Sequence, residues 1–354
     1  MQKPLPHRIV LAGGNGHVGQ VLARHFLAAG SEVVVLTRGT GSGKRPKDIH
    51  SSDLRLTPAY RTVAWDVRTF GAWIDELDAA DVVINLVGRS VNCRYSEANR
   101  REILQSRVQS TEVLGHALGR LQHAPRVWLN ASTATIYAHT FGAPNDEASG
   151  RIGGDEPDVP ADWHFSIEVA ENWERAFFAA KTPHTRKIAL RSAMTMSADR
   201  GSVFDELLRL VRFGLGGASG SGKQYVSWIH ELDFAQAIDF LIANEDLDGP
   251  VNVASPAPLP NAEFMCALRQ AWGIAVGLPA TEWMLSIGAL VIGTETELIL
   301  KSRRVVPGRL LERGFQFTFP EWRAAAMDLV EKWRTEARGQ SRNALMSREQ
   351  KGAL

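Results

Sequence analysis

Short apolar runs alternate with helical patterns along most of the chain. The run RIVLAGG at residues 8–14 precedes the helical pattern GQVLARHFLAAG, and the run EVVVLTR follows at residues 32–38. Similar runs recur at residues 62–66, 81–88, 126–133, 187–196 and 250–256. Near-continuous apolar strands separated by helices are typical of a parallel sheet covered on both faces. The pattern therefore predicts an α/β protein with a doubly wound Rossmann fold of about seven parallel strands.

Polar and glycine-rich segments interrupt this alternation. Residues 39–58 form a long polar stretch, and loops of this length in compact domains usually bind something or are mobile. A second interruption, at residues 201–228, ends in FGLGGASGSGKQYVSW. We therefore expect three parts, which are a Rossmann domain that binds the cofactor (1–200 and 229–255), a smaller C-terminal α/β domain on the substrate side (201–228 and 256–335) and a polar tail that frays (336–354).

Composition and charge favour a soluble globular protein. The net charge is +1, and the scattered basic residues create no field that would attract nucleic acid or anionic lipid. Cys93 and Cys266 lie far apart without the spacing of a metal site, which suits a reducing compartment. The apolar run at residues 283–293 is shorter than the ~20 residues that span a bilayer, and the N-terminus shows no signal peptide. We expect a cytoplasmic protein without metal, nucleic acid or membrane partners, and homodimer formation is left open.

A glycine-rich loop follows the first expected strand and opens the first expected helix. Glycines at these positions allow a tight turn, close approach of the backbone to a pyrophosphate, and packing of helix on strand. The positive end of the helix then favours the phosphate charge. The alternative is a purely structural turn. We expect a dinucleotide to contact Gly13, Asn15, Gly16, His17, Val18 and Gly19.

The end of the second expected strand bears on the choice of dinucleotide. An acidic residue there would bind the ribose 2′-hydroxyl of NAD, whereas an arginine accommodates the 2′-phosphate of NADP. The sequence has Thr37 and Arg38 and no carboxylate. The alternative is a solvated arginine at a strand end. The residues favour NADP(H) over NAD(H).

Further cofactor contacts are expected after the third and fourth strands. Residues after the third strand usually meet the adenine edge, and those after the fourth run along the cofactor. Simple loop packing is the alternative for each. The remaining expected cofactor-binding residues are Asp66, Val67, Leu86, Val87, Gly88, Arg107 and Arg191, the last of them after the sixth strand.

Taken together, the chain resembles the extended short-chain dehydrogenase/reductase superfamily. The resemblance covers about residues 7–333 and is carried by GGNGHVG, NLVGRSVNCRY, ILQSRVQST, ENWE, RFGLGGASGSGKQYVSWIHELD, GPVNVASPAPLPNAEF and VVPGRLLERGFQF. The block GLGGASGSGKQYVSWIH is the most specific of these. It is similar to an atypical "epimerase family" group, whose members carry a small C-terminal domain of unknown function.

This resemblance implies a catalytic set that the chain only partly matches. The superfamily places a Ser or Thr after the fifth strand and a Tyr-x-x-x-Lys pair on the next helix. Thr133 falls at the first position, where its hydroxyl would donate to a substrate oxygen, unless Ser132 or Thr133 only bonds strand-end backbone. Phe165 and Val169 hold the places of the pair, and neither moves a proton. Another group or water must then do so, or no hydride chemistry occurs.

Five nearby side chains are candidate substitutes. His164 and Glu168 are four residues apart and would share a helix face, and Tyr137 offers a phenol. Cys93 and Tyr95 follow the fourth strand, at the edge of the sheet where such folds bind ligands. The alternative for His164 and Glu168 is a pair on the surface, for the tyrosine a packed side chain, and for Cys93 an inert thiol.

The glycine-rich block at residues 214–233 is expected to close the substrate pocket. Its aromatic residues would form a wall that suits a planar or apolar molecule, unless the block only packs on the core. Trp173 and Glu174 are expected to be a packing residue and a solvated charge. The expected pocket residues are Cys93, Tyr95, Phe165, Tyr225, Trp228 and His230.

The preferred function is an NADP(H)-binding oxidoreductase that acts on a small molecule. One alternative is a nucleotide-sugar-type epimerase, which uses the cofactor transiently. The other is a non-catalytic protein that senses NADP(H) or binds a partner, which the missing pair would permit.

Overall fold

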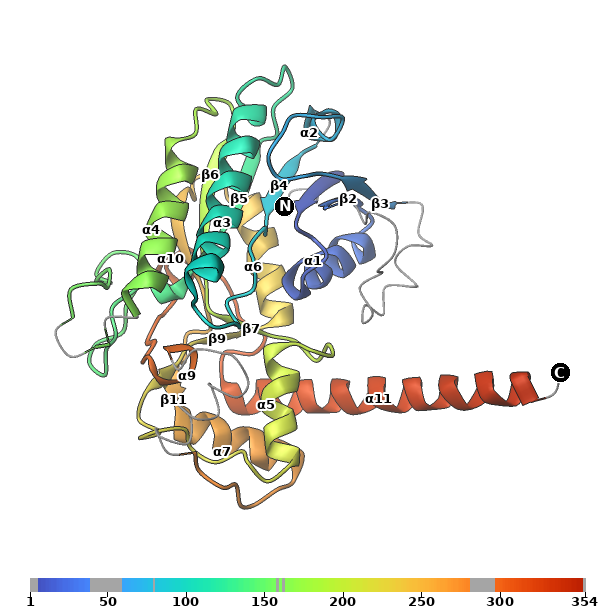
Figure 1. The fold of residues 1–354 in the computed structure, drawn as a ribbon, viewed down its shortest axis with the longest axis vertical. Coiled ribbons are helices and arrows are strands. Elements are labelled where there is room, and N and C mark those ends of the chain that lie inside the picture. The colour runs from blue at the N-terminus through green and yellow to red at the C-terminus, as the bar shows by residue number, and fades with distance from the viewer. Residues whose placement is uncertain are drawn as a thin grey trace.

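Seven parallel strands form the central sheet of the computed structural model, which describes residues 6–38, 59–78, 80–156, 159–160, 163–280 and 297–352. In chain order these strands are β1 (Arg8–Ala12), β2 (Glu32–Thr37), β3 (Tyr60–Ala64), β4 (Val82–Asn85), β5 (Val127–Thr133), β6 (Arg186–Ser192) and β10 (Gly249–Val253). Their order across the sheet is β10-β6-β5-β4-β1-β2-β3, and every neighbouring pair is parallel (Figure 1). The predicted Rossmann fold of about seven parallel strands is confirmed.

Helices cover both faces of the sheet because successive strand side chains point to opposite sides. These helices are α1 (His17–Ala28), α2 (Ile74–Asp78), α3 (Glu97–Leu118), α4 (His164–Ala179) and α6 (Glu231–Ala243). Ile9 and Leu11 of β1 pack with α1 and α6, whereas Val10 and Ala12 pack with α2, α3 and α4. Burial on both faces explains why the strand sequences are apolar throughout.

A smaller unit begins at the carboxyl edge of the sheet. Here β6 leads into β7 (Met194–Met196), which pairs with β9 (Trp228–His230), while β8 (Tyr225–Val226) pairs with β11 (Leu259–Pro260). The unit includes the helices α5 (Val203–Arg212), α7 (Asn261–Trp272) and α11 (Trp322–Gly352). Figure 1 shows them beyond that edge of the sheet.

The smaller unit has its own aromatic core. Phe264 stacks on Trp322 with ring centroids 4.0 Å apart, and Trp228 packs edge-on against the same indole at 5.0 Å. Trp228 is completely buried. The expectation that it forms a pocket wall is therefore wrong, because its large apolar ring fills the core instead.

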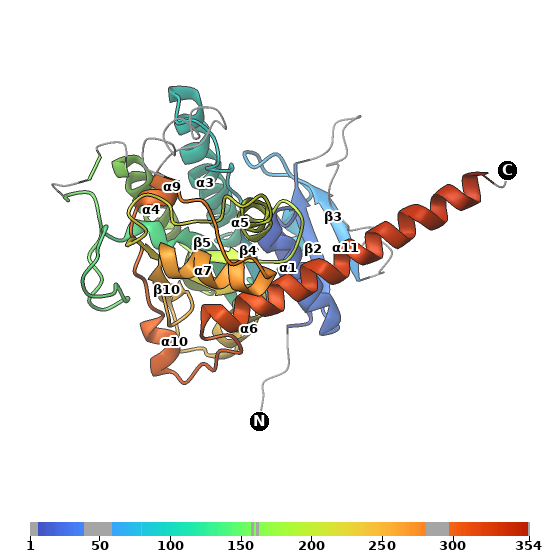
Figure 2. The same ribbon diagram turned by 90° about the horizontal axis from the view of Figure 1, so that it is seen from below.

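The C-terminal end of the chain differs from the expected frayed tail. Helix α11 continues to Gly352, through the residues assigned to that tail (Figure 2). Within the described part of the chain, no helix is long and apolar enough to cross a membrane. The polar stretch at residues 39–58 and the apolar run at residues 283–293 lie outside the described residues.

Candidate functional site

The glycine loop between β1 and α1 has the shape that a dinucleotide requires. Gly13 has a φ of +77°, and a Cβ added there would lie 3.0 Å from Val87. At Gly19 a Cβ would lie 2.4 Å from the Gly14 carbonyl oxygen, so only glycine lets α1 pack this closely. At Gly16 the nearest atom would be 3.8 Å away, and no side chain caps the helix. The loop backbone is therefore open where the N-terminus of α1 would meet a phosphate.

The end of β2 lies beside this loop. The Asn15 amide donates a hydrogen bond to the Thr37 hydroxyl at 2.6 Å, which joins the loop to the strand end. Thr37 is partly buried and Arg38 is exposed. The structure thus brings together the residues expected at the adenosine ribose, and the exposed Arg38 is the outermost of them.

The turn after β3 holds an unusual backbone. The Asp66 carboxylate accepts hydrogen bonds from the Thr69 hydroxyl and from the amides of Thr69 and Arg68, which lower the pKa of Asp66 to about 2. Among the described residues, Val67 is the only non-glycine with a positive φ, at +70°. A β-branched residue in this region costs about 1–3 kcal/mol, and such strain tends to occur at functional sites.

The loop after β4 meets the glycine loop and an arginine of α3. Val87 contacts the Gly13 position, and a Cβ on Gly88 would lie 3.0 Å from the Arg107 guanidinium carbon. Arg107 donates to the carbonyl oxygens of Arg89 and Ile103, and it stacks over the Trp173 ring at 5.1 Å. Burial lowers the pKa of Arg107 to about 10, and no carboxylate of the described chain pairs with it. Arg107 therefore brings uncompensated positive charge to the expected cofactor path.

The positions of the missing catalytic pair form an apolar cluster. Phe165 and Val169 are buried against Ile103 of α3, and Cys93 and Tyr95 pack on the outside of the cluster. The rings of Tyr95 and Phe165 meet edge to face, with centroids 5.1 Å apart. Three of the expected pocket residues, Cys93, Tyr95 and Phe165, thus come together.

Thr133 is the last residue of β5. Its hydroxyl oxygen accepts a hydrogen bond from the Thr135 amide at 3.1 Å, which caps the short helix η2 (Ala134–Ile136). This is the backbone bond that the sequence left open as the alternative. It uses only an acceptor lone pair, so the hydroxyl hydrogen can still be donated to a ligand.

Tyr137 and Arg191 belong to a buried network. Arg191 lies within β6 and makes two hydrogen bonds to Glu174, at 2.8 and 2.7 Å. A third goes to the Tyr137 hydroxyl, which donates to Asn252. Burial raises the pKa of Tyr137. The phenol and the guanidinium are both engaged within this network, and the expectation that Glu174 is solvated is wrong, because it is buried and balances the arginine.

His164 and Glu168 lie on the exposed face of α4. Phe165 and Val169, one position further along, face the interior of the same helix. The surface-pair alternative therefore describes His164 better than a catalytic role. Tyr225 is partly buried in β8, with Arg304 over its ring at 4.4 Å.

His230 is completely buried at the start of α6, so it cannot form a pocket wall as expected. Its Nδ1 accepts from the Leu232 amide at 3.1 Å, and its Nε2 lies 2.9 Å from Asp328. These contacts assign the hydrogen of the neutral ring to Nε2. Burial and Lys332 lower the pKa of His230 to about 4, against the opposing effect of Asp328. Protonation would also remove the Nδ1 acceptor at the positive end of a helix.

Acidification should therefore destabilise the protein through His230. The folded state keeps this ring neutral, whereas the unfolded chain takes up the proton below about pH 6.5, so stability falls as the pH drops from about 6.5 towards about 4. We expect a loss of about 2 kcal/mol between pH 7 and pH 5 from this residue, measured by urea unfolding. The matched control is His230→Asn, which keeps a capping acceptor but does not titrate. The same pH dependence in both proteins would contradict the assignment.

Sequence reasoning missed a charged cluster that the C-terminal region brings to η2. The Lys301 amine lies 3.5 Å from Glu297 and donates to the Thr135 carbonyl oxygen, and burial lowers the pKa of Lys301 to about 8. Arg303 donates to the Thr135 hydroxyl at 3.1 Å, and Ser166 of α4 donates to Glu297 at 2.5 Å. The contacts with Thr135 and Ser166 join residues more than 130 positions apart in the chain, so no local pattern reveals them.

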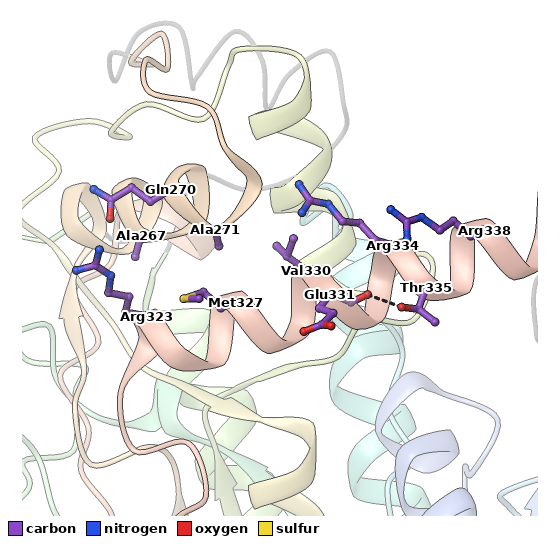
Figure 3. Close-up of a pocket in the computed structure, with 10 residues that line it drawn as sticks. All are labelled: Ala267, Gln270, Ala271, Arg323, Met327, Val330, Glu331, Arg334, Thr335 and Arg338. Atoms are coloured by element: carbon purple, nitrogen blue, oxygen red, sulfur yellow. Dashed lines mark hydrogen bonds between the residues drawn. The ribbon is translucent and has the colours of Figure 1, made fainter.

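A separate groove of about 560 Å³ lies between α7 and α11 (Figure 3). None of the expected site residues lines it. Its lining residues are Ala267, Gln270, Ala271, Arg323, Met327, Val330, Glu331, Arg334, Thr335 and Arg338. The groove belongs to the smaller unit and is distinct from the glycine loop.

Known proteins resemble the chain over nearly its whole length. Residues 9–157 match the NAD dependent epimerase/dehydratase family, and residues 280–329 match a domain of unknown function, DUF1731. The mouse epimerase family protein SDR39U1 is 30% identical over 91% of this chain and 99% of its own length. An epimerase family protein of Staphylococcus epidermidis is 28% identical, with the same coverage. The crystal structure of human SDR39U1 with NADPH superposes with a TM-score of 0.73 at 27% identity, over 92% of this chain and 99% of that one.

Proposed function

The chain belongs to the NAD-dependent epimerase/dehydratase family, and we propose that it is an NADP(H)-binding oxidoreductase acting on a small molecule. The observation that carries this proposal is the open glycine loop, tied by Asn15 to a strand end that offers Thr37 and Arg38. The structure of human SDR39U1 with NADPH supports the same choice of cofactor.

The residues of the site fit this cofactor in chemistry as well as in shape. Bound NADP(H) would supply or accept a hydride. The loop backbone and the α1 N-terminus would hold its pyrophosphate, and Arg38 its 2′-phosphate. The Thr133 hydroxyl would orient the substrate oxygen, and the cluster around Phe165 would exclude water from that side.

Cofactor turnover tests the proposal against its alternatives. Purified protein is mixed with NADPH and a panel of carbonyl compounds, and absorbance at 340 nm is followed. An oxidoreductase consumes NADPH with at least one compound. An epimerase binds the cofactor without net consumption but interconverts a sugar nucleotide, and a sensor does neither. Either of the last two results would overturn the proposal.

The choice of cofactor gives a sharper prediction. NADPH should bind at least roughly tenfold more tightly than NADH, and Arg38→Ala should remove most of this difference, because a hydrogen bond to a charged group contributes ~1.5–3 kcal/mol. Isothermal titration calorimetry measures both affinities. The matched control is Arg175→Ala, which removes an exposed arginine of α4 and should leave the difference unchanged. Equal affinities of the wild-type protein for the two cofactors would contradict the prediction.

A further inference from the structure

The groove between α7 and α11 is elongated. Phe264 of α7 stacks on Trp322 at the start of α11. Further along both helices, Trp272 packs edge-on against Trp333, so the helices run side by side in the same direction. The residues that α11 contributes to the lining extend over positions 323–338. With a rise of 1.5 Å per residue, this stripe is about 22 Å long. The groove therefore has the length of a third helix of about fifteen residues.

The floor of the groove is small and apolar. Ala267 and Ala271 lie one turn apart on α7, and Figure 3 shows Met327 and Val330 of α11 opposite them. Met327 is 58% exposed, although its side chain is large and apolar. Flexible thioether side chains are common on surfaces that bind helices of other proteins, and small residues let another backbone approach closely. This floor suits the apolar face of an amphipathic helix.

Positive charge lies at both ends of the groove. Figure 3 shows Arg323 at one end and Arg334 and Arg338 at the other. Arg334 is held in place, because it donates to the Trp272 carbonyl oxygen at 2.8 Å and stacks over the Trp272 ring at 4.3 Å. Glu331 is the one carboxylate in the lining, so the lining residues carry a net charge of +2. An occupant that complements the groove is therefore acidic at its ends.

The same charges disfavour a second copy of this chain as the occupant. A contact between identical faces would bring the arginines of one α11 against those of the other, and like charges repel. Acidic groups of a different protein would instead meet the arginines. Arg323 and Arg334 are eleven residues apart on one helix, which is about 16 Å. Two acidic groups that reach both ends should be separated by a similar distance.

We propose that the groove between α7 and α11 is a docking site for an amphipathic helix of a partner protein. The apolar face of that helix lies on Ala267, Ala271 and Met327, and its acidic side chains, about eleven residues apart, pair with the arginines at the two ends. None of the residues of the glycine loop lines the groove, so this inference is independent of the proposed function.

Fluorescence anisotropy with two labelled peptides tests the docking on the full-length protein. Both peptides have about sixteen residues, with leucine along one helical face and glutamine elsewhere. One carries glutamates in its first and last turns, and the other carries lysines at the same positions. The wild-type protein should bind the acidic peptide at least about tenfold more tightly than the basic one. This preference should shrink as NaCl is raised from roughly 50 mM to 500 mM, because salt screens exposed charges.

Charge reversal gives the decisive comparison. Arg323 and Arg338 are exposed, so Arg323→Glu with Arg338→Glu should leave the fold intact and make the basic peptide the tighter ligand. The matched control is Arg101→Glu with Arg175→Glu, which makes the same change in net charge at exposed positions of α3 and α4. The control protein should keep the wild-type preference. NADPH affinity should be the same in all three proteins.

Three results would overturn the proposal. The first is equal affinity of the wild-type protein for the two peptides, and the second is no binding of the acidic peptide at protein concentrations up to roughly 200 µM. The third is an acidic-peptide affinity that the charge-reversed protein retains. Sedimentation velocity without peptide tests the other occupant. A wild-type dimer that dissociates on charge reversal at 323 and 338 would assign the groove to a second copy and exclude the partner helix.

Discussion

Replacing Glu174 with glutamine is expected to lower the free energy of unfolding by about 3–5 kcal/mol, because it removes the charge that balances a buried arginine. Arg191 and Glu174 are about nine-tenths buried and share two short hydrogen bonds. Glu174 also accepts from the Ser132 hydroxyl at 2.6 Å. An amide can keep part of this geometry but not the charge. Urea unfolding followed by circular dichroism measures the loss.

Glu171→Gln is the matched control for this experiment. Glu171 lies three residues earlier on α4 but is exposed, so the same chemical change should alter stability by less than about 0.5 kcal/mol. Equal effects of the two substitutions would show that the pair is not a significant source of stability. Because the network includes Tyr137 and Asn252, its loss should also loosen the contact between β6 and β10.

The framework of the fold could be predicted because each part has a local signal. Strands buried on both faces must be apolar over four or more residues, which makes them visible in the sequence. Gly13 and Gly19 indicate a tight turn in the sequence, and the structure leaves no room for a larger residue at either position. The residues after β1, β2 and β4 then meet at one edge, since parallel strands share their carboxyl ends.

The prediction that aromatic residues of the glycine-rich block form a pocket wall fails for a physical reason. A tryptophan or histidine beside flexible backbone is equally compatible with a ligand pocket and with a core. Trp228 fills the core of the smaller unit, and His230 caps α6. The sequence contains no signal that separates these roles, because the partners Trp322 and Asp328 are about 95 residues away along the chain.

Polar contacts between segments that are distant in the chain are the second feature that could not be predicted from the sequence. Lys301 and Arg303 reach the loop after β5, and Glu297 reaches α4, only because the C-terminal region folds back onto them. Glu174 could not be recognised as a buried partner of Arg191 from its surroundings on a helix. Side-chain pairing depends on the three-dimensional arrangement, whereas strand patterning does not.

Installing the superfamily's catalytic pair should damage this protein. Phe165 and Val169 are buried against Ile103, so Phe165→Tyr with Val169→Lys would place an ammonium in an apolar cluster. An unpaired buried charge costs several kcal/mol. We therefore expect a large loss of unfolding free energy, measured by urea titration, and no general alcohol dehydrogenase activity.

The chain offers a closely matched control on the same helix. His164→Tyr with Glu168→Lys introduces the same two residues at the same spacing, one position earlier and on the exposed face. There the ammonium stays in water, and stability should change by less than about 0.5 kcal/mol. The contrast between the two double variants therefore isolates burial from the identity of the side chains.

Thr133→Ala completes the test, because it removes a hydroxyl from the other side of the site. Its bond to the Thr135 amide is local, and the glycine loop does not depend on it, so NADPH binding should persist while any turnover falls. If the pair at 165 and 169 instead gave a stable, active enzyme and Thr133→Ala had no effect, the active site would lie elsewhere. The substrate oxygen would then not bind in the space between β5 and α4.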